Sequence, residues 1–232
     1  MFDTKAPVFA AVRRILCLSL LFAMSLAQAQ TPPTADEIAA YRGLFAAAHS
    51  GDTAALVQLL KQNEPVNARD TKARTPLHVA SYAKQREAIA VLVKAGADVN
   101  ALEYQAYDPV TIAAVANDEK TLALLLSLGA SPKNITSPYH GNALIAAAHL
   151  GHAGVVKQLI EAGADLDHVN NLHWTALIEA VVLGDGGKNH TEVVRLLLKA
   201  GANAKLADSA GKTPLMLARE RGYEGMVQLL NF

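Results

Sequence analysis

Histidine has the greatest chemical potential of the side chains in this sequence, since its imidazole binds metal ions and exchanges protons near neutral pH. The chain has eight histidines among 232 residues, and six of them lie between positions 140 and 190. A zinc site needs three or four converging ligands, usually with cysteine or carboxylate among them. The candidates are His140, His168, His173 and either Asp165 or Asp167. Because no H-E-x-x-H motif occurs and the single cysteine is Cys17, we interpret the histidines as surface or turn-ordering residues and expect neither metal nor cofactor.

A glycine-rich segment, Asp185-Gly186-Gly187-Lys188-Asn189, is the second feature that could bind a ligand. Such loops can bind phosphate, but the pattern G-x-x-x-x-G-K-[ST] is absent and no strand is expected before the segment. We expect the segment to lie in the tight turn between the two helices of its unit. It is either a simple loop extension or a partner or ligand contact, with Asp185 and Lys188 as its candidate residues; a phosphate or metal site is the third interpretation.

Catalytic motifs are missing from the chain. No G-x-S-x-G nucleophile motif occurs, and Ser137 and Ser209 lie in expected turns without an obvious base. We therefore predict that the protein is not an enzyme.

Two markers recur along the chain with one shared period. Gly96-Ala97-Asp98 recurs at residues 129, 163 and 201, in steps of 33, 34 and 38 residues. Thr75-Pro76-Leu77 aligns with triplets at residues 108, 142, 175 and 213, in steps of 33, 34, 33 and 38 residues. Two markers with the same period predict tandem copies of one structural unit.

Each marker has a role at a helix end. Threonine, asparagine or aspartate caps the first helix of a unit, and proline is tolerated at the first helical position. Gly151, Gly184 and Gly222 are expected to end that helix in the left-handed conformation. A second helix follows, as at residues 155–160, and ends at a glycine such as Gly163. Only 5% of residues are aromatic, so alanine, leucine and valine supply the apolar content and favour closely packed helices.

The repeated residues resemble the ankyrin repeat family. Thr75-Pro76-Leu77-His78-Val79-Ala80 is close to the family's T-P-L-H-x-A, and Gly151-His152-Ala153-Gly154-Val155-Val156 resembles its G-H-x-E-V-V. The resemblance implies an all-α ankyrin-repeat solenoid with hairpin-like fingers. About six helix-turn-helix units are expected, at about residues 38–70, 71–103, 104–136, 137–170, 171–208 and 209–232.

The N-terminal residues 1–29 have the composition of a cleavable export signal. Lys5, Arg13 and Arg14 precede a short apolar run at residues 15–26, and Ala27-Gln28-Ala29 fits a cleavage site. The run is shorter than the roughly 20 residues of a membrane span, although an uncleaved anchor is the alternative. We expect a short linker at residues 30–37, a periplasmic or else secreted location, and no membrane insertion after cleavage.

Departures from the repeat pattern suggest where a partner binds. Unit five contains the insertion 185–189, and the fourth finger has one extra residue within 134–141. These fingers, together with Tyr107-Asp108-Pro109, resemble a set of bacterial exported ankyrin proteins. The candidate finger residues are Arg74, Tyr104, Tyr107, Tyr139, His140, His173, Trp174 and Lys212. Tyr82, His149 and the insertion residues Asp185 and Lys188 are secondary candidates.

We therefore predict a protein-interaction scaffold whose partner is another protein. Tyrosine, tryptophan and arginine are enriched among residues that anchor interfaces; the competing interpretation is that these rings pack on neighbouring fingers. The zero formal net charge does not favour a nucleic-acid binder, and a monomer is expected. The alternatives are a small-ligand or metal-binding protein supporting envelope stress protection and a secreted effector that binds host proteins.

Overall fold

A computed structural model describes residues 30–231, so the predicted export signal at residues 1–29 lies outside the described residues. Within the described part, the chain forms helices and turns, with one isolated bridge between Thr136 and Gly141. None of these helices is long and apolar enough to cross a membrane. The all-α fold expected from the repeats is confirmed.

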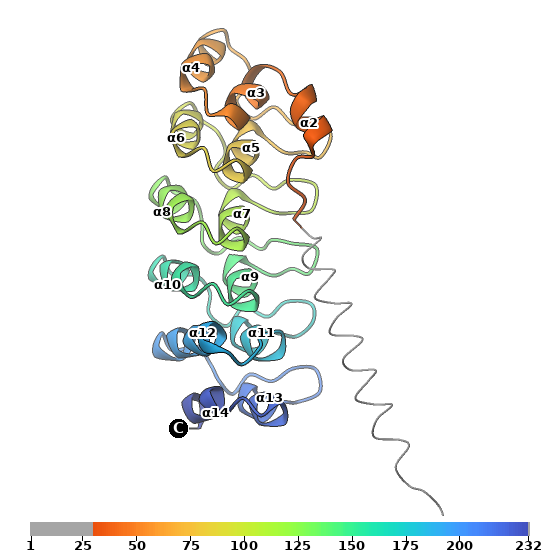
Figure 1. Ribbon diagram of the computed structural model, residues 1–232, viewed down its shortest axis with the longest axis vertical. Helices are drawn as coiled ribbons and strands as arrows, with labels where there is room; N and C mark the ends of the chain where they lie inside the picture. The colour runs from red at the N-terminus through yellow and green to blue at the C-terminus, as the bar shows by residue number, and fades with distance from the viewer. Residues whose placement is uncertain (1–29, 232) are drawn as a thin grey trace, which may run out of the picture. The chain divides into compact units, whose positions relative to one another are not determined.

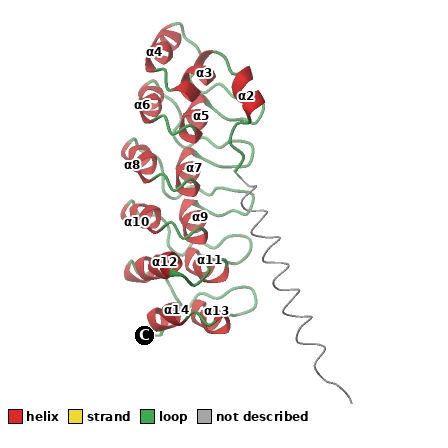
Figure 2. Ribbon diagram, in the orientation of Figure 1, coloured by secondary structure: helices red, strands yellow, loops and turns green. Residues whose placement is uncertain are grey.

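The helices form two rows that run side by side through the repeat domain (Figures 1 and 2). The inner row is α3 (Gly43–Ser50), α5 (Pro76–Tyr82), α7 (Pro109–Val115), α9 (Ala143–His149), α11 (Ala176–Val182) and α13 (Pro214–Arg221). The outer row is α4 (Thr53–Lys61), α6 (Arg86–Lys94), α8 (Glu119–Ser127), α10 (Ala153–Glu161), α12 (Lys188–Lys199) and α14 (Glu224–Leu230). Each helix contacts its partner in the other row and its neighbours in its own row. Loops between successive pairs project from the inner row as the fingers.

The predicted caps begin five of the inner helices. Thr75, Asp108, Asn142, Thr175 and Thr213 each accept a hydrogen bond from the backbone N–H three residues further on. Leucine, isoleucine, valine and alanine side chains between the two rows form one continuous core, in which Leu77, Leu144 and Leu177 are almost fully buried. Local capping starts each helix, and burial of its apolar side then holds it in the stack.

A short helix, α2 (Ala35–Ala40), precedes the first pair. The expected linker 30–37 is therefore irregular only up to Thr34, whose side chain caps α2. The sequence has no repeat marker in this segment, so the repeat pattern did not indicate a helix here.

The insertion in unit five changes the second helix as well as the turn. Helix α12 has 12 residues, whereas α6, α8 and α10 have nine each. Lys188 and Asn189 belong to the first turn of α12, so the expectation that the whole insertion lies in the inter-helix turn is wrong. The added helical turn is closed by backbone hydrogen bonds, such as that from the Thr191 N–H to the carbonyl of Gly187. These bonds make it more rigid than a loop of equal length.

Glycines after the inner helices follow the prediction at two of three positions. Gly151 and Gly222 are left-handed, with φ of 69° and 68°. Gly184 is not left-handed; the left-handed residue of this turn is Gly186, with φ of 70°. Gly184 is required for another reason, because a Cβ there would collide with the backbone oxygen of Ala180.

His78 is fully buried and joins two units. Its Nδ1 lies 2.8 Å from Thr75 Oγ1 and 3.1 Å from the Thr75 backbone nitrogen, and its Nε2 lies 3.2 Å from the carbonyl oxygen of Tyr107. Since the Thr75 N–H donates to Nδ1, the proton of the neutral ring resides on Nε2 and is donated to Tyr107. Burial lowers the pKa of His78 to about 4.

We predict that His78 makes stability depend on pH. The folded pKa of about 4 lies below the ordinary value of 6.5, so the unfolded chain binds a proton first as pH falls. The contribution is complete above pH 6.5 and is lost towards pH 4, with a total on the order of 3 kcal/mol. Urea unfolding at several pH values should show this loss in the wild type and a smaller slope in His78→Gln. Equal slopes in both proteins would contradict the assignment.

We also predict that Gly184→Ala costs about 1–3 kcal/mol of stability, because the added methyl must displace the last turn of α11. Gly225→Ala is the matched control: its Cβ would lie 3.5 Å from Thr191 Cγ2, an ordinary contact. The control should gain up to about 1 kcal/mol from helix propensity. Thermal unfolding measures both changes. A Gly184→Ala melting temperature equal to that of the wild type would show that the added methyl is tolerated.

Candidate functional site

The fingers are organised by one side-chain oxygen each. Asp70 Oδ1 accepts hydrogen bonds from the backbone N–H groups of Lys72 at 2.8 Å and Arg74 at 2.9 Å. Glu103, Asn170 and Asp208 accept from the residues two and four positions further on in the same way. Each of these turns is therefore closed by its own first residue.

The remaining finger is wider by the one residue that the sequence indicated. The N–H of Thr136 donates to the carbonyl of Gly141, five residues on, where the other fingers span four. Ser137 Oγ takes the role of the missing carboxylate and lies 3.2 Å from the nitrogen of Tyr139 and 3.4 Å from that of Gly141.

Backbone hydrogen bonds join three pairs of adjacent fingers. Tyr104 donates to the carbonyl of Lys72, Ser137 to that of Ala106 and Asn171 to that of Tyr139, at 2.9, 3.0 and 3.0 Å. The fingers of units two to five thus form one connected platform, in which the backbone at each tip is held in position.

Left-handed residues hold the tips, and two of them are predicted site residues. His140 and His173 have φ of 53° and 61°, at the position where Ala73 and Ala106 have 56° and 61°. Glycine is the usual residue in this conformation, although histidine is among the side chains that tolerate it. Both histidines are exposed.

Tyr104 is the most exposed aromatic side chain of the predicted set, with 76% of its surface accessible. Tyr139 is half-buried, and Trp174 is half-buried against the core. Tyr82 is half-buried near the end of α5. Of the predicted aromatic anchors, Tyr104 therefore matches the expectation of an exposed ring best.

The structure corrects the prediction that the residue before each helix cap is exposed. Arg74 is 1% exposed and Tyr107 is 4% exposed. Lys212 is half-buried, and its Nζ lies 2.7 Å from Glu220. The last residue of each finger turn points back toward the helices, so residues of this slot contribute to packing or pairing instead of forming a free surface.

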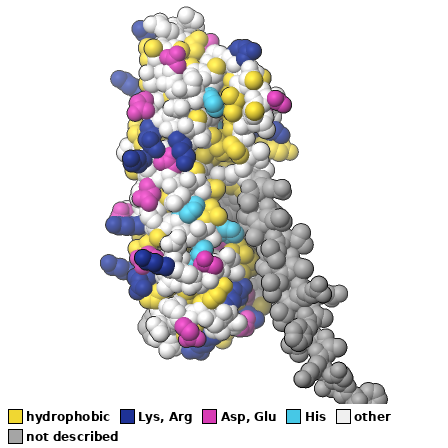
Figure 3. Space-filling view, in the orientation of Figure 1, with side chains coloured by type: hydrophobic (Ala, Val, Ile, Leu, Met, Phe, Trp, Pro, Cys, Tyr) yellow, Lys and Arg dark blue, Asp and Glu magenta, His cyan; other side chains and the backbone are white. Residues whose placement is uncertain are grey.

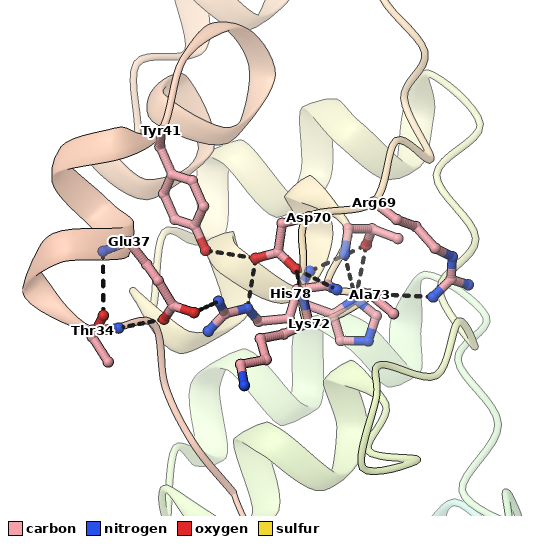
Figure 4. A network of polar contacts seen from close by, with 10 residues as sticks. Thr34, Glu37, Tyr41, Arg69, Asp70, Lys72, Ala73 and His78 are labelled. Carbon is pink, nitrogen blue, oxygen red and sulfur yellow. Dashed lines mark hydrogen bonds and ion pairs between the residues drawn. The ribbon is translucent and has the colours of Figure 1, made fainter.

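Arg74 lies in a polar network with three partners from the N-terminal part of the chain (Figure 4). Its Nε lies 2.7 Å from Asp70 Oδ2, its Nη2 lies 2.8 Å from Glu37 Oε1, and Tyr41 donates to Asp70 at 3.0 Å. The Thr34 N–H, and then Arg74, hold the pKa of Glu37 below its usual range. Burial opposes ionisation of Asp70, but the N–H and guanidinium of Arg74 outweigh burial and lower its pKa.

A second polar cluster joins units four and five. Glu179 is 3% exposed, and its two oxygens lie 2.9 Å from Asn170 Nδ2 and 3.3 Å from His149 Nδ1. Asn170 is the residue that closes the fifth finger, so Glu179 connects His149 to that finger. His149 therefore has a buried partner, which the sequence prediction did not identify.

Glu179 was missed although the chain contains a signal for it. The fourth residue of the other inner helices after the cap is Val79, Ile112, Ala146 or Leu217. A single charged residue in this apolar column needs a buried partner, and comparison of the units alone would have identified it.

A second group of missed residues is apolar. Leu102, Ile135 and Val169 each precede the first residue of a finger turn and are 38%, 48% and 43% exposed. They recur in steps of 33 and 34 residues, so the repeat places them as a stripe beside the tips. The same period identifies them in the sequence, outside the helix markers.

The insertion contacts unit four through His190. Asp185 Oδ1 accepts from the N–H of Gly187 and lies 2.8 Å from His190 Nδ1, while His190 Nε2 lies 3.0 Å from the carbonyl oxygen of His149. The Gly187 N–H, and then His190, lower the pKa of Asp185. Asp185 and Lys188 are both exposed. His149 is thus linked to the insertion through its backbone and to the fifth finger through its side chain.

The metal-site candidates do not converge. His168 Nε2 lies 2.6 Å from the carbonyl oxygen of His140, and no group of three His, Asp or Glu side chains among the described residues is arranged to hold a metal ion. On the face drawn in Figure 3, lysine and arginine gather mainly over the outer helices.

Comparisons with known proteins agree with this architecture. A family model described as ankyrin repeats (three copies) matches residues 16–103, 110–188 and 144–231. The ankyrin repeat protein YahD of Escherichia coli K12 is 44% identical over 98 residues, which are 42% of this chain and 49% of YahD. Protein R664 of Acanthamoeba polyphaga mimivirus is 33% identical over 33% of this chain and 44% of its own. The alignments therefore span about half or less of these curated relatives.

Solved structures match over a larger share of the chain. An ankyrin repeat domain from Acinetobacter baumannii is 45% identical with a TM-score of 0.77, and the match covers 81% of this chain and 95% of that domain. The ankyrin repeat domain of Bcl-3, a member of the IkappaB family, is 28% identical with a TM-score of 0.73, covering 82% of this chain and 85% of its own.

We predict that Glu179→Ala destabilises the fifth finger, because it leaves the buried Asn170 amide without its acceptor, at a cost of about 1–3 kcal/mol. Glu179→Gln keeps a carbonyl oxygen for that amide and should cost less. Amide exchange at Leu172 and Trp174 measures the finger directly. Identical exchange in the alanine and glutamine variants would show that Glu179 does not support the turn.

Proposed function

Because the chain belongs to the ankyrin repeat family, whose members are typically non-enzymatic scaffolds for protein–protein interaction, we propose that it binds a partner protein through its finger platform and has no catalytic activity. The observation that carries the proposal is the exposed ring of Tyr104 on a turn closed by Glu103 and hydrogen-bonded to the neighbouring finger. Because the backbone of this turn is already fixed, less conformational entropy is lost on binding than for a residue on a flexible loop.

The apolar stripe extends the contact surface beyond Tyr104. Leu102, Ile135 and Val169 lie on three successive fingers and leave a third to a half of their surfaces accessible. A partner that covers Tyr104 and this stripe would bury apolar area next to an aromatic anchor, which is the usual composition of an interface core.

The proposed compartment is the bacterial periplasm. Two features support it: residues 1–29 have the composition of an export signal, and no cysteine occurs after Cys17. A chain without cysteine after the signal needs no protection from an oxidising environment. The proposal includes a monomeric state, with one partner protein per scaffold.

The proposal predicts that Tyr104→Ala abolishes partner capture while the fold is retained. Loss of an exposed aromatic anchor should reduce recovery of the specific partner at least about tenfold. Bait protein is incubated with periplasmic extract of the native host, and captured proteins are quantified by mass spectrometry. Lys61→Ala, on the outer helix α4, is the control and should capture as the wild type does.

His173→Gly extends this test. It removes an exposed ring from a left-handed position, where glycine is under no strain, so stability should be unchanged or slightly raised. A loss of capture in this variant would therefore reflect binding. Equal recovery by wild type, Tyr104→Ala and His173→Gly would rule out the fingers as the binding surface.

A further inference from the structure

Helix α2 is too short to be stable by itself. It has six residues, none of them buried, and isolated helices below about 12 residues are marginal in water. It lies beside α3, toward the side from which the fingers project (Figure 1). Its position therefore depends on a few specific contacts with the repeat domain.

The contacts are concentrated on one charge. Glu37 of α2 lies 2.8 Å from Arg74, and Tyr41, which ends α2, donates to Asp70. Figure 4 shows Glu37 and Tyr41 pointing from the N-terminal segment toward Asp70. Tyr41 is also anchored to α3 by stacking on Phe45, with ring centroids 5.5 Å apart. Glu37 is thus the polar link between the body of α2 and the stack.

Arg74 has two carboxylate partners of different kinds. Asp70 belongs to the same finger and also closes its turn, so it stays with Arg74 whenever the finger is folded. Glu37 comes from the weakly packed helix. A guanidinium that is 1% exposed needs both ends paired, since an unpaired buried charge is strongly destabilising. The Nη end of Arg74 is therefore a carboxylate-binding position, and in this structure the carboxylate is that of Glu37 from helix α2.

One tyrosine lies close to this position. Tyr41 donates to Asp70, the other carboxylate partner of Arg74, at 3.0 Å. Glu103 is held by the backbone of its own finger, so it does not pair with Arg74. Glu37 is therefore the carboxylate that pairs with the Nη end of Arg74, and this position suits one acidic side chain.

We propose that the Nη end of Arg74 is a binding site for a carboxylate-bearing segment of a partner protein, and that α2 occupies this site in cis as a stand-in for that segment. The inference rests on the proposed function but places a second contact away from the finger tips. Glu37 competes with the partner, so release of α2 increases the affinity of the site. Binding involves an ion pair, so affinity falls as salt rises.

The probe is a synthetic peptide of residues 31–40, which carries the chemistry of α2 without Tyr41. Its binding is measured by NMR titration against the full chain, Glu37→Gln and the control Asp36→Asn. Asp36 lies in the same helix, is exposed and has the same charge, but no ion pair with Arg74. A second peptide carries glutamine in place of its glutamate.

We expect Glu37→Gln to bind the first peptide at least about tenfold more tightly than wild type or Asp36→Asn, because the tethered segment no longer competes at high effective concentration. Amide exchange of α2 should rise in the same variant, and the glutamine peptide should bind none of the proteins. If amide exchange of α2 is unchanged in Glu37→Gln, Glu37 does not hold α2. If exchange rises but the peptide does not bind, Arg74 only holds α2 in place and is not a binding site. Either result overturns the proposal, whereas the Tyr104 capture experiment tests the finger surface separately.

Discussion

The orientation of the finger residues, and with it the proposed binding surface, depends on the side-chain oxygen that closes each finger turn. Asp70, Glu103, Asn170 and Asp208 accept two backbone hydrogen bonds each. That closure determines orientation: the two tip residues point outward, and the last residue of the turn points back toward the helices. The same constraint exposes Tyr104 and buries Tyr107 within one finger.

The chemical identity of this oxygen also determines what the neighbouring inner helix can contain. An aspartate at the position can only accept hydrogen bonds, and the units with Asp70 and Asp208 have Val79 and Leu217 in the apolar column. Asn170 has an amide that can donate, and its unit buries Glu179 against that amide. A carboxylate in place of Asn170 would set two like charges side by side, which is destabilising. Asn170 and Glu179 therefore form one coupled feature of unit five.

The period and the cap residues predicted the fold, because both are local signals repeated along the chain. Residues such as Thr75 and Asp108 specify a helix start without reference to the rest of the structure. The burial of Arg74 and Tyr107 could not be predicted in this way, since it depends on how the finger turns are closed by Asp70 and Glu103, which are not part of either repeat marker. The Glu37–Arg74 pair joins residues from outside and inside the repeat pattern, so no comparison between units could identify it. The stripe of Leu102, Ile135 and Val169 could have been found from the repeat period, but only by also comparing the units at positions between the helices.

Helix α2 lies at the N-terminal end of the repeat stack and pairs through Glu37 with Arg74 of the second unit. The terminal units of a solenoid have a neighbour on one side only and need a polar cover. Helix α2 provides such a cover with Glu37 and Tyr41, yet buries no residue of its own. A cover held mainly by an ion pair is stable only while its carboxylate has no competitor. The proposed exchange depends on this difference: a partner carboxylate can compete for an ion pair at the finger of unit two, whereas buried apolar packing would offer it no such position.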